Sequence, residues 1–386
     1  MSKFSPPRRT PLRLGVLVGV VATTIVASAL AAGATSTAGT GVAATGAVTA
    51  VTATPTTKAT PKATPKPDPG QRRHKPKPTP TAKPTATPTA KPTQSPTAGP
   101  TAAPKGDIWR PALRSRWQYQ LEGNPAYPAT GGVNVGICAV PQTGGACVRP
   151  DVYDIDLYAN VGNNTTLNTE AVKAIHARGA KAICYVDAGS IEDFRPDYQQ
   201  FLDWHNSHGK SLLGKPFSST FPNERWANIN NDKGQRDFLL QMMEARVAKC
   251  ASAGFDGVEF DVVHAHEEGA SVTGWNISPA TQLTYNRALA GIAHRYGLAV
   301  GLKNDLSQVA DLVADFDFAV NEECFQYDEC GDLKPFVKAG KPVFQVEYLT
   351  APGTFCPKAN STTFDVNAIK KSKDYDLNDL PYTPCR

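Results

Sequence analysis

The chain has 386 residues, of which 40 are Lys or Arg and 35 are Asp or Glu, giving a formal net charge of +5. This average conceals a basic tail and an acidic remainder. Residues 1–105 hold 14 basic residues and one acid, a net +13, whereas the rest holds 26 basic and 34 acidic residues, a net −8. An acidic globular part repels nucleic acid and attracts cationic ligands, so we expect no nucleic-acid partner.

Residues 1–34 have the composition of an export segment. Four basic residues and no acid precede an apolar stretch, residues 14–34, which contains the small-residue triplets typical of cleavage sites. The stretch is about 20 residues long, which also suits an uncleaved membrane anchor. The sequence leaves both outcomes open, and either one predicts a secreted or extracytoplasmic protein.

Residues 35–106 are predicted to form a disordered linker. Thr, Pro, Ala and Lys dominate this segment, and large apolar side chains are almost absent, so it cannot bury enough surface to fold. At polyproline spacing its ~70 residues would span roughly 200 Å, a length that suits a spacer through a cell envelope. The positive charge of residues 1–105 favours attachment to anionic wall polymers or lipid, although an inert tail fits equally well.

The third segment, residues 107–386, is predicted to be one (β/α)8 barrel. At its centre, residues 254–261 read as a helix end closed by Gly254, a turn, and a short buried strand with alternating apolar and acidic residues. Similar short apolar runs occur at 117–121, 152–158, 181–187, 298–305, 316–322 and 343–348. Helical patterns separate most of them, at 169–178, 238–253, 280–296 and 333–339. Alternating strands and helices indicate a parallel sheet, and polar residues at the ends of many strands are typical of a barrel.

The connection formed by residues 188–231 is too long for an ordinary loop of such a barrel, so we expect it to extend over the barrel mouth. It is rich in aromatic residues, among them Tyr198, Trp204, Phe217, Phe221 and Trp226. These rings are equally suited to stacking on sugars and to forming a small separate core.

All eight cysteines follow residue 137. In an exported chain they are free to form disulfides, and sequence proximity favours three local pairs, Cys138–Cys147, Cys324–Cys330 and Cys356–Cys385. Cys184 is expected to face the helical layer and to meet Cys250. The sequence does not decide whether these two form a fourth disulfide or remain buried thiols.

Asp261 is the sharpest catalytic candidate, because it ends a strand on which Glu259 lies deeper on the same face. The deeper carboxyl group should have a raised pKa and the outer one should remain ionised. Two strands later, Glu322 alternates in step with Phe318 and Val320, so its side chain is expected to point into the barrel. Two carboxylates that face the interior from different strands are what glycoside hydrolysis requires. Glu347 is the rival partner, whereas Glu323 is predicted to point away.

Further polar residues at strand ends are candidates for binding substrate. Lys303, Asn304 and Asp305 end one strand, and the other candidates are Glu259, Glu347, Tyr185, Asp187, Asp156, Tyr348 and Trp226. His264 and His266 have acidic neighbours, but no third histidine has a matching position, so we predict no metal site. Neither a phosphate-binding loop nor a nucleophile-elbow motif occurs, so we expect neither nucleotide use nor acyl transfer. We also expect no cofactor.

These motifs together resemble glycoside hydrolase family 114. The resemblance rests on segments 117–121, 153–156, 183–196, 224–226, 254–259, 285–286, 301–305 and 320–324. It implies a (β/α)8 barrel with endo-α-1,4-polygalactosaminidase activity, a cationic amino-sugar polymer as substrate, and Asp261 and Glu322 as the catalytic pair. The sequence departs from the family pattern at residues 262–264. Two alternatives remain at this stage, namely a non-catalytic carbohydrate-binding or wall-adhesion protein and a hydrolase of another α-glycan.

Overall fold

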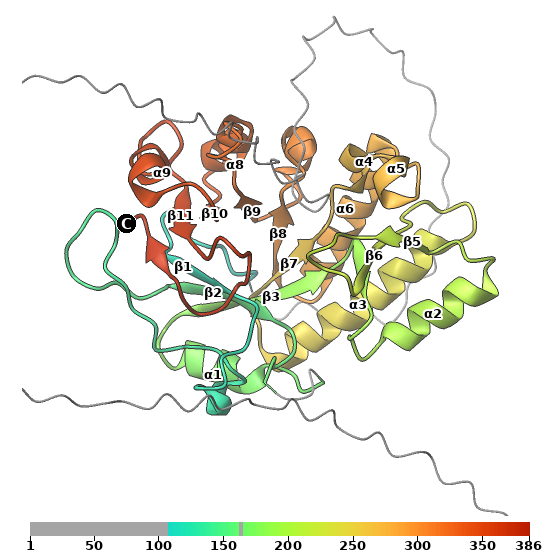
Figure 1. Ribbon diagram of the computed structural model, residues 1–386, viewed down its shortest axis with the longest axis horizontal. Coiled ribbons are helices and arrows are strands. Elements are labelled where there is room, and N and C mark those ends of the chain that lie inside the picture. Colours follow the sequence, from blue (N-terminus) through green and yellow to red (C-terminus); the bar gives the residue numbers. More distant parts are fainter. Residues whose placement is uncertain (1–106, 162–164) are drawn as a thin grey trace, which may run out of the picture. The chain divides into compact units, whose positions relative to one another are not determined.

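The computed structural model describes residues 107–161 and 165–386 (Figure 1). The predicted export segment, residues 1–34, and linker, residues 35–106, lie outside the described residues. Within the described part of the chain, none of the helices combines the length and hydropathy that a membrane span requires.

Eight parallel strands form the barrel, in the order of the chain. They are β1 (Trp117–Gln120), β2 (Val152–Asp156), β3 (Lys181–Asp187), β7 (Gly257–Asp261), β8 (Ala299–Lys303), β9 (Phe318–Glu322), β10 (Val343–Glu347) and β11 (Asn367–Lys370). A short antiparallel strand, β12 (Thr383–Pro384), pairs with β11. Side chains join the first strand to the last, since Trp117 Nε1 donates to the carbonyl oxygen of Asn367 at 2.8 Å. The predicted fold class is therefore confirmed.

Helices surround these strands (Figure 1). The longest are α3 (Gln235–Ala253) and α6 (Pro279–Arg295), and the shorter ones are α1 (Thr169–His176), α7 (Val309–Leu312), α8 (Lys334–Lys338) and α9 (Pro352–Ala359). Local signals set their ends. Ser278 Oγ accepts from the N–H of Thr281 at the start of α6, and Gly254 ends α3 with φ +93°. The four predicted helical segments correspond to α1, α3, α6 and α8.

The long connection after β3 folds as a small unit beside the barrel (Figure 1). It contains α2 (Tyr198–Ser207) and a three-stranded antiparallel sheet of β4 (Ser190–Glu192), β6 (Glu224–Ala227) and β5 (Leu213–Pro216). Lys215 Nζ donates to the carbonyl of Ser271, in α5 (Ala270–Thr273), at 2.7 Å. We call residues 188–231 the insert.

The aromatic residues of the insert divide between a small core and the wall of a cavity. Trp226 is fully buried, and its ring lies 4.8 Å from that of Phe217. Trp204 stacks on Phe238 of α3 at 5.2 Å. By contrast, Phe217 and Phe221 line the cavity described below. Trp226, which was predicted to bind substrate, is instead part of a hydrophobic core.

Four disulfides are present, and they include the three predicted local pairs. The fourth joins Cys184 on β3 to Cys250 on α3, with 6.0 Å between their Cα atoms. The outward parity of Cys184 explains this bond, because its neighbours Ile183 and Tyr185 alternate to the inner face. The bond links the barrel wall to its longest helix.

Strand register gathers the polar strand ends at one rim. Asp187 pairs with Asp261, Glu259 pairs with Gly301, and Lys303 pairs with Val320. Because side chains alternate along each strand, the residues paired in this way share the inner face. Glu322 lies two residues beyond Val320 and has the same parity.

The junction between β3 and β7 depends on Gly189. The N–H groups of Ala188 and Gly189 donate to the carbonyl of Asp261, at 3.1 and 3.2 Å. A Cβ atom at Gly189 would lie 1.8 Å from the carbonyl oxygen of Val262, a contact that backbone atoms cannot tolerate. Glycine is thus required where the insert leaves the barrel beside Asp261.

We predict that Gly189→Ala destabilises the protein by about 1–3 kcal/mol, the usual cost of overpacking, and lowers activity because Val262 must move. Gly291→Ala is the matched control. It lies inside α6, where the nearest contact to an added Cβ is a side-chain atom at 4.0 Å. It should raise stability by about 0.5–1 kcal/mol. Urea unfolding of both variants measures this, and equal stability of the two would contradict the role of Gly189.

Candidate active site

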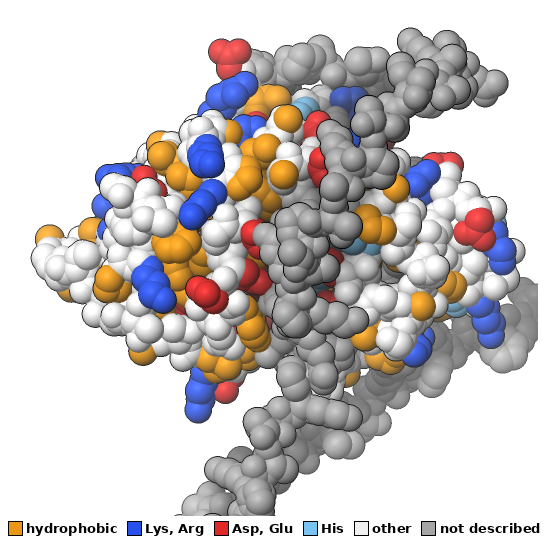
Figure 2. Space-filling model, turned by 90° about the horizontal axis from the view of Figure 1, so that it is seen from above, with side chains coloured by type: hydrophobic (Ala, Val, Ile, Leu, Met, Phe, Trp, Pro, Cys, Tyr) orange, Lys and Arg blue, Asp and Glu red, His pale blue; other side chains and the backbone are white. Residues whose placement is uncertain are grey.

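A cavity of about 160 Å³ opens at the carboxyl ends of the barrel strands. Five carboxyl groups line it, those of Glu122, Glu224, Asp261, Glu322 and Glu323. Aromatic residues form much of the remaining wall, namely Tyr119, Tyr185, Phe217, Phe221, Tyr327, Tyr348 and Tyr375. On the face seen in Figure 2, acidic side chains likewise gather near the middle. Acids and aromatic rings together are typical of sugar-binding clefts.

Lys303 lies at the centre of this arrangement. Its side chain is 1% exposed, and Nζ lies 3.1 Å from Asp261 Oδ1, 3.4 Å from Glu322 Oε2 and 3.2 Å from Glu259 Oε1. Burial alone would lower the pKa of Lys303, but these carboxylates raise it well above its ordinary value. The positively charged Lys303 ammonium therefore contacts the carboxylates of both candidate catalytic residues, Asp261 and Glu322.

Asp261 is held as an anion. Tyr185 donates to its Oδ2 at 2.9 Å, and the N–H of Val262 donates to its Oδ1 at 2.7 Å. Burial would raise the pKa of Asp261, but the Lys303 charge and these two donors outweigh burial and lower it. The side chain is 18% exposed, so an ionised oxygen faces the cavity.

Glu322 is positioned by β8 and β10. Tyr348 donates to its Oε1 at 2.6 Å, and its own N–H donates to Asn304 Oδ1 at 3.0 Å. The side chain is 31% exposed, more than that of Asp261. Because one ammonium nitrogen lies 3.1 Å from Asp261 Oδ1 and 3.4 Å from Glu322 Oε2, those two oxygens are at most 6.5 Å apart.

Glu259 lies beneath the cavity. It is fully buried, and it accepts a hydrogen bond from Tyr119 at 3.1 Å in addition to its contact with Lys303. Burial raises its pKa, in the direction predicted from the sequence. Burial and the charge of Glu259 raise the pKa of its neighbour Asp154 well above the ordinary value, which favours the protonated form of Asp154. Glu259 thus positions Lys303 and, contrary to our prediction, does not reach substrate.

The predicted substrate contacts divide into two groups. Tyr185, Lys303, Asn304 and Tyr348 line the cavity. Asp156 and Asp187 do not, because other residues engage them. Arg195 donates to both oxygens of Asp156, at 2.7 and 2.8 Å, and the N–H of Ser190 donates to Asp187 at 2.7 Å.

Asp305 and Glu347 also lie away from the cavity lining. Asp305 is fully buried and accepts from Asn286 Nδ2 at 2.8 Å. Glu347 follows Val346, which pairs with Glu322 and shares its inner face, so the Glu347 side chain points outward. There it accepts from the N–H of Phe325 at 2.9 Å. Strand parity therefore removes Glu347 as a rival to Glu322.

Glu323 lines the cavity, whereas strand parity predicted that it points away. The strand ends at Glu322, and Glu323 has φ +59°, so the chain turns and parity no longer applies. Glu323 Oε1 accepts from Tyr375 at 3.2 Å. Glu224 and Tyr375 were also missed. Both lie outside the barrel strands, where no sequence periodicity indicates which way a side chain points.

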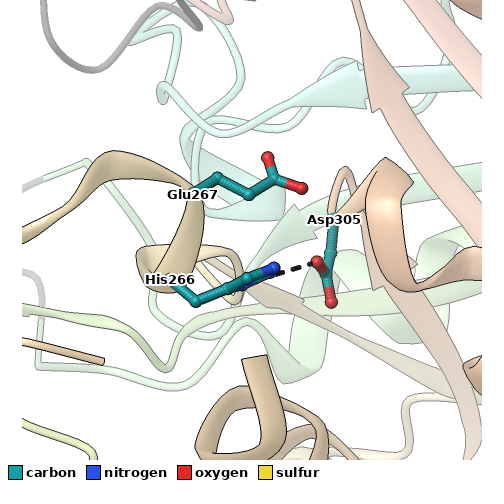
Figure 3. Close-up of side chains that lie close together, drawn as sticks. All are labelled: His266, Glu267 and Asp305. Carbon is teal, nitrogen blue, oxygen red and sulfur yellow. Dashed lines mark ion pairs between the residues drawn. The ribbon is translucent and has the colours of Figure 1, made fainter. Parts of the chain in front are cut away.

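His266, Glu267 and Asp305 form a cluster that could in principle hold a metal ion (Figure 3). His266 Nδ1 lies 3.9 Å from Asp305 Oδ1. Hydrogen bonds to protein groups engage the same side chains. Ser307 Oγ donates to Glu267 at 2.8 Å and lies 3.1 Å from His266 Nε2. We therefore interpret the cluster as packing between the loops that follow β7 and β8, apart from the cavity.

The fold and the paired carboxylates define a glycoside hydrolase of the barrel type. The sequence profile of Glycoside-hydrolase family GH114 matches residues 98–384, and the chain belongs to this family. The alternative of a non-catalytic protein is thereby set aside.

The chain is also similar to solved structures. The crystal structure of Aspergillus fumigatus Ega3 in complex with galactosamine is 26% identical in sequence, with a TM-score of 0.54 over 73% of this chain and 100% of that chain. The glycoside hydrolase domain of PelA from Pseudomonas aeruginosa is 14% identical, with a TM-score of 0.45 over 69% of this chain and 97% of that chain. A comparison with curated proteins found no match.

We predict that Lys303→Met shifts the acid limb of the pH profile of kcat/KM to higher pH. Lys303 is the main group that lowers the pKa of Asp261 against burial, so its loss should raise that pKa. The ionised, reactive form would then be lost at a higher pH as the solution is acidified. Lys303→Arg keeps the charge and serves as the matched control. An unchanged acid limb in a folded Lys303→Met variant would contradict this role.

Proposed function

We propose that this enzyme cleaves α-1,4-linked galactosamine-containing polysaccharide within the chain, with Asp261 as nucleophile and Glu322 as acid and base. One observation carries the proposal: both carboxylates contact the same buried ammonium and both are exposed to one cavity. Family membership supports the reaction class. The similarity to Ega3, whose structure contains galactosamine, supports the sugar.

The charge of the cavity supports a cationic substrate. Five carboxyl groups line it, and Lys303 is the single Lys or Arg among its described lining residues. Three carboxylates already contact that lysine, so its charge is offset within the protein. A galactosamine polymer brings positive charge to this surplus of acids.

The separation of the carboxylates favours retention of configuration. Retaining glycosidases place the two groups about 5–5.5 Å apart and inverting ones about 6.5–9.5 Å apart. The 6.5 Å limit would be reached only if Lys303 Nζ lay on the straight line between the two oxygens. Asp261 would attack the anomeric carbon as Glu322 protonates the departing oxygen. Glu322 would then take a proton from water, which displaces Asp261 from the sugar.

We further propose that the enzyme acts outside the cytoplasm. Four disulfides within the described residues fit an oxidising, extracytoplasmic compartment. Secretion or anchoring by residues 1–34, and attachment to a wall or membrane through residues 1–105, remain proposals drawn from composition.

Asp261→Asn and Glu322→Gln test the catalytic pair. On galactosamine polymer we expect Asp261→Asn to lower kcat on the order of 10³-fold or more, because the nucleophile is lost. Glu322→Gln should be similarly impaired on polymer, but less impaired on a galactosaminide with a nitrophenol leaving group, which needs little protonation. Glu170→Gln, at an exposed ion pair with Lys173, is the control. A folded, fully active Asp261→Asn would exclude the assignment.

Nuclear magnetic resonance of the first-formed products tests the stereochemistry. A double displacement should release the α anomer before mutarotation, because two inversions at the anomeric carbon restore its configuration. Initial accumulation of the β anomer would show instead that water attacks directly, with Asp261 as a base.

A further inference from the structure

Glu224 is a cavity acid that the proposed two-carboxylate reaction does not use. It begins β6 of the insert and is partly exposed, at the wall of the cavity. Ser190 Oγ lies 3.0 Å from Glu224 Oε2, and the same hydroxyl contacts Asp187. Glu192 pairs with Glu224 across the β4–β6 ladder. The carboxyl group is therefore held at the cavity wall by its contact with Ser190 of β4.

The Ser190 hydroxyl lies between two carboxyl groups, those of Asp187 and Glu224, and this geometry favours a proton on one of them. A serine hydroxyl has one proton, so Ser190 cannot donate to Asp187 and Glu224 at once. A proton on one of the two carboxyl groups would satisfy the second contact. Burial, and then the charges of Asp187 and Glu192, raise the pKa of Glu224 to about 9, the higher of the two. Protonation is therefore favoured at Glu224.

Glu224 lies on the nucleophile's side of the cavity. Asp187, which shares Ser190 with Glu224, pairs directly with Asp261 across β3 and β7. Asp261 also contributes to the raised pKa of Glu224, as a nearby negative charge does. Glu323 instead follows the proposed proton donor Glu322 in the chain, and after burial the charge of Glu322 is the largest contribution to its raised pKa.

Chemistry places the sugar's amino group on the same side. Asp261 is proposed to attack the anomeric carbon, and in galactosamine the amine is attached to the adjacent carbon. The amine of the sugar that bonds to Asp261 must therefore lie close to that carboxylate. Of the other lining acids, Glu224 is the one whose pKa the charge of Asp261 helps to raise, whereas the charged neighbours of Glu122 are Asp156, Asp376 and Arg195.

We propose that Glu224 binds the 2-ammonium group of the sugar seated against Asp261, and so selects unacetylated galactosamine at that subsite. This inference rests on the proposed function and goes one step further, to a single residue and a single subsite. When the ammonium arrives, Glu224 releases its proton to solvent and forms an ion pair. An N-acetyl group is neutral and larger, so it cannot make that pair.

The test uses an α-1,4-galactosamine polymer in which a known fraction of the amines is acetylated. Cleavage turns the sugar beside Asp261 into a new reducing end, which borodeuteride reduction labels for sequencing by mass spectrometry. We expect galactosamine at almost every reducing end made by the wild type. Glu224→Gln should lower kcat/KM on the unacetylated polymer about 10- to 100-fold, since a charged hydrogen bond is lost. Its reducing ends should include N-acetylgalactosamine near the substrate's own fraction.

Each arm has a matched control. Asp193→Asn removes an exposed acid of the same insert and should leave the reducing ends unchanged. Non-reducing ends come from the sugar on the far side of the cut bond, so their acetylation should not change in Glu224→Gln. The glutamine is isosteric with a protonated Glu224 and should fold. Should it fail to fold, Ser190→Ala removes the hydroxyl that positions Glu224 and should relax the same selectivity.

Two results would overturn the inference. One is a folded Glu224→Gln enzyme whose reducing ends remain pure galactosamine. The other is a Glu323→Gln enzyme that relaxes the reducing ends when Glu224→Gln does not. A wild-type enzyme that cleaves no galactosamine polymer would instead remove the proposed function itself, so the two failures are distinct.

Discussion

The buried ammonium of Lys303 is the interaction on which the rest of the active site depends. Four inward-facing groups from β1, β7 and β9 converge on it, and without it three carboxylates would be left close together in a site of low dielectric. The lysine keeps Asp261 ionised against burial, and two tyrosines hold the outer oxygens of the pair. Burial and the charge of Glu259 raise the pKa of Asp154, which favours a neutral Asp154 in the deepest layer of the site.

The backbone adopts a left-handed conformation directly after three of the barrel strands that carry these groups. The residue after each of Asp261, Lys303 and Glu322 has a positive φ, +59°, +53° and +59° for Val262, Asn304 and Glu323. Such conformations are costly for residues other than glycine, above all for the β-branched Val262, and they cluster at functional sites. Here each turn brings a second group to the cavity directly after the first, since Val262, Asn304 and Glu323 all line it. The tight approach of Gly189 to Val262 keeps one of these turns in place.

Periodicity predicted what lies on the strands and failed beyond their ends. Alternation alone placed Asp261 and Glu322 on the inner face and Cys184 on the outer one, and the structure agrees with each. The sequence analysis also proposed Glu347 as an alternative to Glu322. Val346 pairs with Glu322 on the inner face, so the next side chain, that of Glu347, points outward. Glu323 was misplaced because a positive φ follows the last strand residue. Asp156 and Asp187 have cavity-facing parity, but Arg195 and Ser190 of the insert engage them, and no local pattern reveals such distant partners.

Three further acids of the cavity lining, of which Glu224 belongs to the insert, are not neutralised by Lys303. Lys303 offsets the acids of the barrel floor, but Glu224, Glu323 and Glu122 line the same cavity without contacting it. Burial raises the pKa of Glu224 to about 9 and that of Glu323 to about 7, and it raises the pKa of Glu122. Ionising such groups in the empty cavity costs free energy, and a neutral sugar would leave that cost in place. An ammonium group on the substrate offsets the free energy of ionising these acids. The lining acids therefore favour the binding of a cationic polysaccharide over that of a neutral one.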